Sequence, residues 1–271
     1  MPTLLYQLDA FTDQRYRGNP AAVTVLDAYP DDAALQAMAA ENNLPETAFL
    51  VRQGEDYALR WFTPCVEVPL CGHATLASAA VVMERLEPRR REVTFHSASG
   101  PLTVRREAAQ PDVSADPSTR YTLNFPVRRC KPAALPAGLA EALGGHPVEV
   151  AHDGFNYVAR MADEHTVRRL APDLDAIARL CDVAGVIVTA QGDGLYDIVS
   201  RYFAPVKGIP EDPVTGGAHC ALAHFWSERL GRTELRAWQA SPRGGEIRLR
   251  LLGDRVELEG SCVFYMQGEL C

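Results

Sequence analysis

A short pattern that occurs once in each half of the chain constrains the fold more than any other feature. Arg60-Trp61-Phe62-Thr63-Pro64 corresponds to Arg201-Tyr202-Phe203-Ala204-Pro205, and each run is soon followed by an apolar helix that begins at glycine. The first helix begins in Cys71-Gly72-His73-Ala74 and the second in Thr215-Gly216-Gly217-Ala218. We interpret the pair as an ancient duplication; a chance match is the alternative.

The residues around the two helices predict strands, because alternating and β-branched runs recur there. Strands are expected at 4–11, 22–26, 47–51, 57–62, 93–96, 102–106, 121–125, 148–151, 157–161, 185–189, 197–203, 246–251, 256–259 and 262–266. Helices are expected at 31–43, 73–86, 137–143, 163–180 with an interruption at Pro172, and 218–230. The segment 73–86 is apolar all round, which indicates burial, and 218–230 mirrors it.

These elements predict an α/β (α+β) protein of two similar halves, each a strand-rich layer with a buried helix. The polar, proline-containing stretch 108–119 is the best boundary. We therefore expect an N-terminal half at 1–112 and a C-terminal half at 118–271, whose last strand is free to cross back to the first half.

Composition excludes several classes of protein. With 271 residues and 47% apolar content, the chain can bury a large core. A net charge of −8 argues against a nucleic-acid partner. We see neither a signal peptide nor an apolar run near the ~20 residues that span a bilayer, so a soluble cytoplasmic protein is expected. The seven cysteines are scattered without a CxxC pair, which predicts reduced thiols.

The glycine-led helix starts are candidate anion sites. A helix N-terminus carries unpaired N–H groups and partial positive charge, and glycine lets a ligand approach that backbone closely. Gly72 begins one helix, and Gly216 and Gly217 begin the other. Two such ends facing one cleft would hold a carboxylate or an enolate. Ordinary strand-to-helix turns are the alternative.

Two carboxylates lie at element junctions and are candidates for proton transfer. Glu46 follows Pro45 at the start of a strand, where partial desolvation would raise its pKa toward neutrality and make it an acid or base. Asp212 immediately precedes the second glycine-led helix and would complement it as an acid or orienting partner. A surface glutamate, and an aspartate in a turn or N-cap, are the alternatives.

His73 and Cys71 flank the first helix start. His73 could donate to a substrate oxygen or shuttle a proton; a core histidine satisfied by a neighbour is the alternative. The Cys71 thiol beside a helix N-terminus could act as a base, but the matching position holds Thr215, so a two-thiol mechanism lacks one base. The spacings of His73, Cys71 and the pair His219-Cys220 fit no standard zinc pattern, and we expect no metal.

At this point the resemblance to a known family becomes specific. The chain resembles the PhzF-like isomerases of phenazine biosynthesis and, in its Cys-Gly-His form, the phenazine-biosynthesis-like domain proteins. The resemblance rests on Asn-Leu-Pro-Glu-Thr at 43–47, Glu-Val-Pro-Leu-Cys-Gly-His-Ala at 67–74, Glu-Asp-Pro-Val-Thr-Gly-Gly-Ala-His at 211–219, and further runs at 9–12, 17–23, 61–64, 201–205 and 243–246. It extends over nearly the whole chain.

The resemblance implies the diaminopimelate-epimerase-like fold, with a curved, mostly antiparallel sheet around a central helix in each half and the site between the halves. It implies no metal or organic cofactor, a homodimer, and a small carboxylated substrate. In such a site Glu46 moves the proton and His73 and Asp212 assist. The amides around Gly72, Gly216 and Gly217 bind the substrate carboxylate, with Asn19, Cys71 and Thr215 beside them.

This chain departs from the family pattern at two positions. Gly217 stands where the family commonly has serine, and Cys71 is absent from the phenazine enzyme itself but used by epimerase relatives. The chain is therefore expected to be a cofactor-independent isomerase or epimerase with Glu46 as the acid/base. A thiol-assisted epimerase using Cys71, and a non-catalytic metabolite-binding or interaction protein, remain as alternatives.

Overall fold

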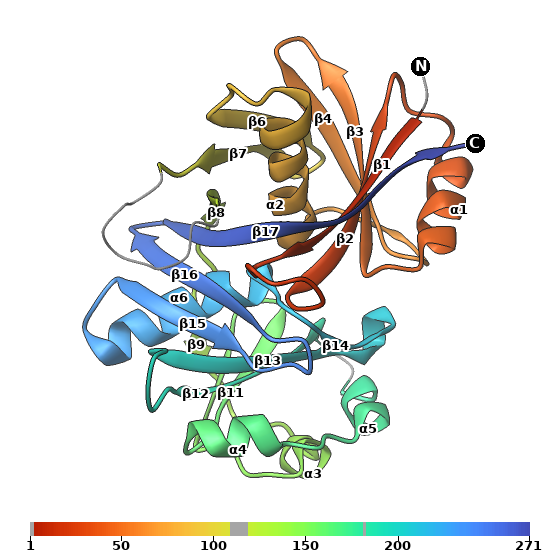
Figure 1. Ribbon diagram of the computed structural model, residues 1–271. Coiled ribbons are helices and arrows are strands. Elements are labelled where there is room, and N and C mark those ends of the chain that lie inside the picture. Colours follow the sequence, from red (N-terminus) through yellow and green to blue (C-terminus); the bar gives the residue numbers. More distant parts are fainter. Residues whose placement is uncertain (1–2, 109–118, 181–182) are drawn as a thin grey trace. The chain divides into compact units, whose positions relative to one another are not determined.

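A computed structural model describes residues 3–108, 119–180 and 183–271 (Figure 1). Cys181 and the core of the expected boundary, at 113–117, lie outside these residues. The chain divides into two compact units, Met1–Asn124 together with Glu259–Cys271 (unit 1) and Phe125–Leu258 (unit 2). None of the described helices has the length and apolar character of a membrane span. The cysteines that the structure describes are all free.

Unit 1 is built from strands around one buried helix. Its strands are β1 (Thr3–Ala10), β2 (Asn19–Leu26), β3 (Glu46–Gln53), β4 (Asp56–Phe62), β5 (Glu67–Val68), β6 (Glu92–Ser97), β7 (Gly100–Arg106), β8 (Arg120–Pro126) and most of β17 (Arg255–Leu270). Its helices are α1 (Asp32–Asn42) and α2 (Gly72–Val81), which continues as the π-helical turn η1 (Val82–Leu86).

The unit 1 sheet follows the order β17-β1-β2-β3-β4-β6-β7-β8, with β5 paired to β4. The pairs β2–β3 and β4–β6 are parallel and the others antiparallel. Strands β8 and β17 also pair, which joins the two ends of the sheet. Helix α2 packs against β1, β2 and β3, and every residue from His73 to Val81 is buried. The all-round apolar pattern therefore predicted the buried helix correctly.

Unit 2 carries a second sheet. Its strands are β9 (Lys131–Pro132), β10 (Glu149–His152), β11 (Asn156–Arg160), β12 (Gly185–Gln191), β13 (Ile198–Ala204), β14 (Ile209–Asp212), β15 (Glu234–Gln239) and β16 (Gly245–Leu252). Its helices are α3 (Leu139–Leu143), α4 (Glu164–Arg169), α5 (Leu174–Ala178) and α6 (Gly216–Leu230), with a 3₁₀ turn η2 (Pro205–Lys207).

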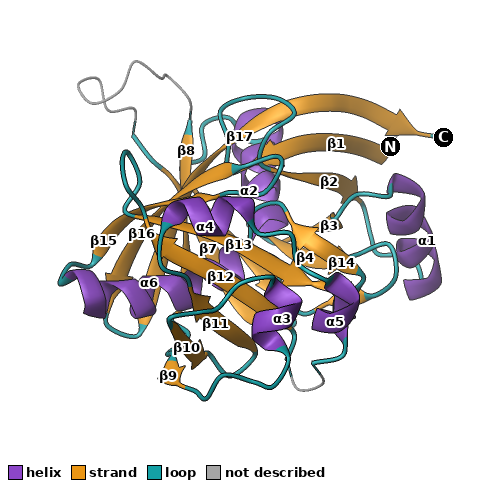
Figure 2. Ribbon diagram, turned by 90° about the horizontal axis from the view of Figure 1, so that it is seen from below, coloured by secondary structure: helices purple, strands orange, loops and turns teal. Residues whose placement is uncertain are grey.

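The unit 2 sheet has the order β9-β10-β11-β12-β13-β15-β16, with β14 paired to β13. The short helices α3, α4 and α5 lie together over β11–β13 (Figures 1 and 2). Their apolar residues form one core with the strands, in which Leu143, Val167 and Ile177 meet Val188 and Phe203. Helix α6 packs against β15 and β16 and is buried over most of its length.

The two units share one topology, as the duplicated pattern predicts. The parallel pair β2–β3 corresponds to β11–β12, and β4–β6 corresponds to β13–β15. Helix α2 follows β5 and precedes β6 just as α6 follows β14 and precedes β15. This correspondence of pairings and crossovers supports duplication over a chance match.

One ion pair occurs at the same place in both units. Arg60 on β4 donates from Nε and Nη2 to the two carboxylate oxygens of Glu67 on β5, both at 2.7 Å. Arg201 on β13 makes the same two-pronged contact with Glu211 on β14, at 2.8 and 2.9 Å. Each pair holds a short strand, β5 or β14, against its sheet. A glycine-led helix follows each of these two strands.

The interruption expected at Pro172 is confirmed, since 163–180 forms two short helices on either side of that proline. Other expected elements differ in the structure. The strands β5, β9, β14 and β15 were not predicted. The strands expected at 256–259 and 262–266 are one continuous strand, β17. Gly260 does not interrupt it: a Cβ there would lie 2.4 Å from the Phe11 ring, so the glycine marks a close approach inside the core.

The matched ion pairs give a stability prediction. The side chains of Arg201 and Glu211 are 10% and 16% exposed, whereas those of Arg60 and Glu67 are 24% and 39% exposed. Arg201→Ala should lower the free energy of unfolding by about 3 kcal/mol, because it leaves the mostly covered Glu211 carboxylate without this partner. Arg60→Ala should cost about 1 kcal/mol or less, since solvent screens the pair. Urea unfolding followed by circular dichroism measures both, and equal losses would contradict this ranking.

Candidate active site

Four of the predicted site residues gather in unit 1. Asn19 begins β2, Glu46 begins β3, Cys71 is the N-cap of α2 and His73 is the second residue of that helix. Strands β2 and β3 are parallel, with Ala21 opposite Glu46, so their first residues lie at the same end of the sheet. Glu46, Cys71 and His73 are 8%, 6% and 4% exposed, and Asn19 is fully buried. The surface-glutamate alternative for Glu46 is therefore wrong.

His73 is the centre of this group. Its Nε2 lies 3.2 Å from Glu46 Oε2, and its Nδ1 lies 3.1 Å from Asn19 Nδ2 and 3.5 Å from Cys71 Sγ. The Asn19 amide and the Cys71 thiol thus meet one ring nitrogen of His73, and the Glu46 carboxyl group faces the other. We call Asn19, Glu46, Cys71 and His73 the unit 1 cluster.

Burial keeps the imidazole neutral. Desolvation lowers the pKa of His73 to about 3, although a hydrogen bond with the Pro20 backbone opposes the shift. Near pH 7 the contact between His73 and Glu46 is therefore not an ion pair. A neutral imidazole can donate one proton without carrying a charge into the site, and it leaves the Glu46 carboxyl group available for proton transfer.

The N-terminus of α2 adjoins this cluster. The Cys71 side chain does not cap the helix, while the Cys71 carbonyl accepts from the Thr75 hydroxyl at 2.5 Å and from the Thr75 amide at 3.3 Å. The carbonyl end of this turn is thus satisfied, and the amides at its start are the groups that a ligand can use. The expectation of an anion-binding helix start beside Glu46 is compatible with this geometry.

Apart from Gly72, which begins α2 in unit 1, the other predicted residues gather in unit 2. Asp212 ends β14 and is 8% exposed, and Thr215 is the N-cap of α6. The Thr215 hydroxyl donates to Asp212 Oδ2 at 2.5 Å. Gly216 and Gly217 are the first two residues of the helix, so both amides lie at its positive end.

Gln239, a residue that the sequence patterns did not single out, holds this turn in place. It is fully buried on β15, accepts from the Thr215 amide at 2.8 Å and donates to the Asp212 carbonyl at 2.6 Å. Its strand was itself not predicted, and its partners lie far away in the sequence. No local pattern could have found it.

His219 and Cys220 have structural roles in α6. The His219 Nδ1 atom lies 2.7 Å from the Thr215 carbonyl, in the same relation that joins Thr75 to Cys71 in unit 1. Burial lowers the pKa of His219 to about 4 and raises the pKa of Cys220 to about 12. His219 is thus held within its own helix, and burial keeps the Cys220 thiol protonated near pH 7.

The two units differ at the position of the carboxylate. The strand register pairs Thr47 with Phe62 and Val186 with Phe203, so Glu46 corresponds to Gly185. A Cβ at Gly185 would lie 2.6 Å from the Phe203 carbonyl and 2.7 Å from the Tyr202 hydroxyl. That position cannot hold a carboxylate, so the duplicated frame carries Glu46 in unit 1 alone.

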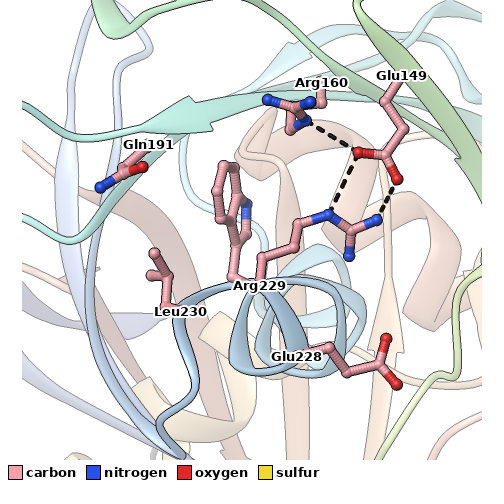
Figure 3. A pocket seen from close by; sticks show the side chains of 7 residues that line it. Glu149, Arg160, Gln191, Glu228, Arg229 and Leu230 are labelled. Atoms are coloured by element: carbon pink, nitrogen blue, oxygen red, sulfur yellow. Dashed lines mark hydrogen bonds and ion pairs between the residues drawn. The ribbon is translucent and has the colours of Figure 1, made fainter.

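A surface pocket of unit 2 is not a second candidate. It has a volume of about 550 Å³ and is lined by Glu228, Arg229 and Leu230 at the C-terminal end of α6 (Figure 3). Thr215 is the N-cap at the other end of this helix. Its arginines, Arg160 and Arg229, both donate to Glu149. Glu149 thus already pairs with both arginines that would attract an anionic substrate.

Comparison with known proteins gives a consistent result. The model of the family described as phenazine biosynthesis-like protein matches residues 8–268. A Pseudomonas aeruginosa protein named as an uncharacterized isomerase is 46% identical over 100% of this chain and 99% of its own length. A phenazine biosynthesis-like domain-containing protein of Mus musculus is 38% identical over 98% of each chain. The crystal structure of a PhzF family protein from Enterococcus faecalis superposes with a TM-score of 0.92 at 40% identity, over the whole of both chains.

The chain belongs to the phenazine biosynthesis-like (PhzF) family. The family resemblance and the fold predicted with it are confirmed. The chain is an isomerase of this family, the class of enzyme that the name of its Pseudomonas aeruginosa relative states. The roles of individual residues, and the substrate, stay predictions.

The departure from the PhzF pattern at Gly217 coincides with an arginine that the sequence patterns did not identify. A Cβ at Gly217 would lie 3.7–3.8 Å from the guanidinium of Arg128. That guanidinium stacks over the Phe155 ring at 4.7 Å and lies 3.8 Å from buried Asp153. In this PhzF-family chain a positive side chain thus stands beside the helix start where the usual serine hydroxyl is missing.

The buried histidines give a pH prediction. In the unfolded chain a histidine has a pKa near 6.5, well above the values of about 3 and 4 for His73 and His219. Below about pH 6.5 the unfolded state therefore binds more protons, and the free energy of unfolding falls as the pH falls toward 4. His219→Gln, which keeps a donor for the Thr215 carbonyl, should make this fall less steep.

Urea unfolding at several pH values between 4 and 7 measures that slope, with the exposed His146→Gln as the matched control. The control should retain the slope of the unmodified protein. An unchanged slope in His219→Gln would show that this imidazole does not contribute to the acid sensitivity.

Proposed function

We propose that this isomerase moves a proton within a small carboxylated substrate without a cofactor, and that Glu46 is the acid/base. The observation that supports this most strongly is the Glu46 carboxyl group, 8% exposed and 3.2 Å from a neutral imidazole beside a helix N-terminus. An intramolecular proton shift needs one group that accepts and returns a proton, and fixed dipoles that stabilise the charge formed between the two steps.

In the first step the Glu46 carboxylate removes a proton from a carbon next to an unsaturated group. The electrons of the broken C–H bond move onto that group, and the α2 amides at Gly72 and His73 stabilise the resulting negative charge. The His73 Nε2–H donates to it as a neutral hydrogen-bond donor, while Asn19 fixes the ring through Nδ1. In the second step protonated Glu46 returns the proton to another carbon, and the enzyme regains its starting state.

The unit 2 residues supply binding in this proposal. The amides of Gly216 and Gly217 bind the substrate carboxylate, and the Arg128 guanidinium takes over from the serine hydroxyl that the PhzF pattern has at position 217. Asp212, held by the Thr215 hydroxyl, assists the proton transfer. The homodimer implied by the family resemblance is part of this proposal as well.

A thiol-assisted epimerase is the second candidate, and one observation favours it. Cys71 is the N-cap of α2 and its Sγ lies 3.5 Å from His73 Nδ1, a position in which a helix dipole stabilises a thiolate. The corresponding N-cap in unit 2 is Thr215, which cannot serve as the second thiol base. We therefore favour Glu46.

Solvent deuterium incorporation tests the choice of base. The protein is incubated in D₂O with a panel of small amino, hydroxy and unsaturated cyclic acids, and exchange is followed by NMR. Glu46→Gln should lower the exchange rate by about 100- to 10,000-fold, the usual contribution of a general base, without changing the fold. Cys71→Ala should retain exchange within a few-fold.

Full activity in Glu46→Gln would overturn the proposal. Loss of exchange in Cys71→Ala with retention in Glu46→Gln would establish the thiol epimerase instead. Saturable binding of a compound that never exchanges label would favour a metabolite-binding protein.

Replacing the arginine tests substrate binding in unit 2. Arg128→Ala should raise KM at least about 10-fold for a carboxylated substrate, because a charge-assisted hydrogen bond is lost. The effect on kcat should be smaller, since in this proposal the arginine binds the substrate carboxylate and takes no part in the proton transfer. Exposed Arg129→Ala is the matched control. Equal KM values for Arg128→Ala and the unmodified enzyme would remove Arg128 from the binding site.

A further inference from the structure

The unit 1 cluster contains more chemistry than the proposed proton transfer uses. A carboxylate oxygen of Glu46, Sγ of Cys71 and a ring nitrogen of His73 all lie within 4.8 Å of one another, and all three residues are buried. The proposed reaction employs the carboxylate and the imidazole. It gives the thiol no task, yet the thiol converges on the same point.

These three groups match the ligand preferences of one class of ion. Thiolate, imidazole and carboxylate together are typical ligands of Zn²⁺, at about 2.3, 2.0 and 2.1 Å respectively. In a tetrahedral complex with such bonds, neighbouring ligand atoms are about 3.3–3.7 Å apart. Cys71 Sγ lies 3.5 Å from His73 Nδ1, already in this range, whereas the Glu46 carboxylate faces Nε2 at 3.2 Å. The three ligand atoms lie within 4.8 Å of one another, so side-chain rotation of about 1 Å would bring them to zinc distances, and a metal on Nδ1 would displace the Asn19 contact.

Charge and placement favour the same ion. One thiolate and one carboxylate balance the two positive charges of Zn²⁺, so the filled site would be neutral, as a buried site requires. All three residues lie at the ends of regular elements, Glu46 on β3 and the others on α2, which fixes their backbones. Three protein ligands leave one coordination position open, which is the arrangement of an accessible rather than a structural zinc site.

We propose that Glu46, Cys71 and His73 form a binding site for a thiophilic divalent cation such as Zn²⁺, and that occupancy inhibits the isomerase reversibly. The sequence spacing could not indicate this site, because Glu46 lies on β3, whereas Cys71 and His73 lie at the start of α2. The inhibition rests on the proposed function, since the ion would occupy the groups that move the proton. The binding itself does not depend on that function.

Zinc titration of the full-length protein tests the binding. Cys65 and Cys271 are exposed thiols, so both are first replaced by serine to remove background. Zn²⁺ is then titrated against a chromophoric chelator, and Co²⁺ is used to detect a thiolate-to-metal absorption band. One equivalent should bind, and Cys71→Ser should weaken the affinity at least about 100-fold and abolish the band.

Cys220→Ser is the matched control, because this thiol is buried in α6 and is not part of the cluster. It should leave affinity and absorption unchanged, and circular dichroism checks that both variants are folded. Equal affinities for Cys71→Ser and the parent, or absence of a bound equivalent, would overturn the site.

Inhibition is measured by the D₂O exchange assay. Zn²⁺ should suppress exchange in the parent, a chelator should restore it, and Cys71→Ser should resist at the same concentration. Binding through Cys71 without suppression would overturn the inhibitory role alone. If Glu46→Gln proved fully active, the proton-transfer proposal would fail while the titration still decided the metal site.

Discussion

In each unit of this isomerase an apolar helix is buried against a sheet, and the rest of the structure depends on that burial. Helix α2 has no polar face that could remain in water, so strands must surround it. Enclosure fixes where its N-terminus emerges, at the end of the sheet where β2 and β3 begin. The positive end of a helix and a strand-start carboxylate thereby come together as a consequence of packing, with Glu46 beside His73.

Chemistry arises where the two copies of this frame differ. The shared parts are structural: the arginine–glutamate pairs on β4–β5 and β13–β14, and the side chains of Thr75 and His219 that meet the N-cap carbonyls. The differences concern reactive groups: the position of Glu46 in unit 1 is held by Gly185 in unit 2. Likewise Cys71 stands against Thr215 at the N-cap. Duplication thus supplied two helix ends, and divergence left the buried carboxylate of Glu46 at the start of β3 without a counterpart at the start of β12.

Much of the frame could be predicted from the sequence because its signals are local. An all-round apolar helix, a glycine before it and alternating strand residues are read within a few positions of one another, and they gave both buried helices and most strands. Glu46, Cys71 and His73 were found because each lies at an element boundary that proline, glycine or a change of periodicity marks, whereas Asn19 was identified only from the family resemblance.

What escaped prediction depends on contacts between distant segments. Gln239 matters only because β15 places it beside Thr215, and Arg128 only because it lies next to Gly217. The continuity of β17 through Gly260 depends on the position of the Phe11 ring. The convergence of Cys71 with Glu46 follows from the packing of α2 on β3, which no spacing rule contains.

The central claim is that one carboxyl group, Glu46, carries the proton from one carbon of the substrate to another. A single-turnover reaction with substrate deuterated at the reacting carbon, run in H₂O, tests it most directly once the exchange panel has identified a substrate. We expect part of the deuterium to appear at the new carbon of the product and the rest to be lost to water while the carboxyl group holds it, and we expect turnover about 100- to 10,000-fold slower in Glu46→Gln. Product without deuterium, formed by Glu46→Gln but not by Cys71→Ala, would contradict the account and establish the thiol as the base.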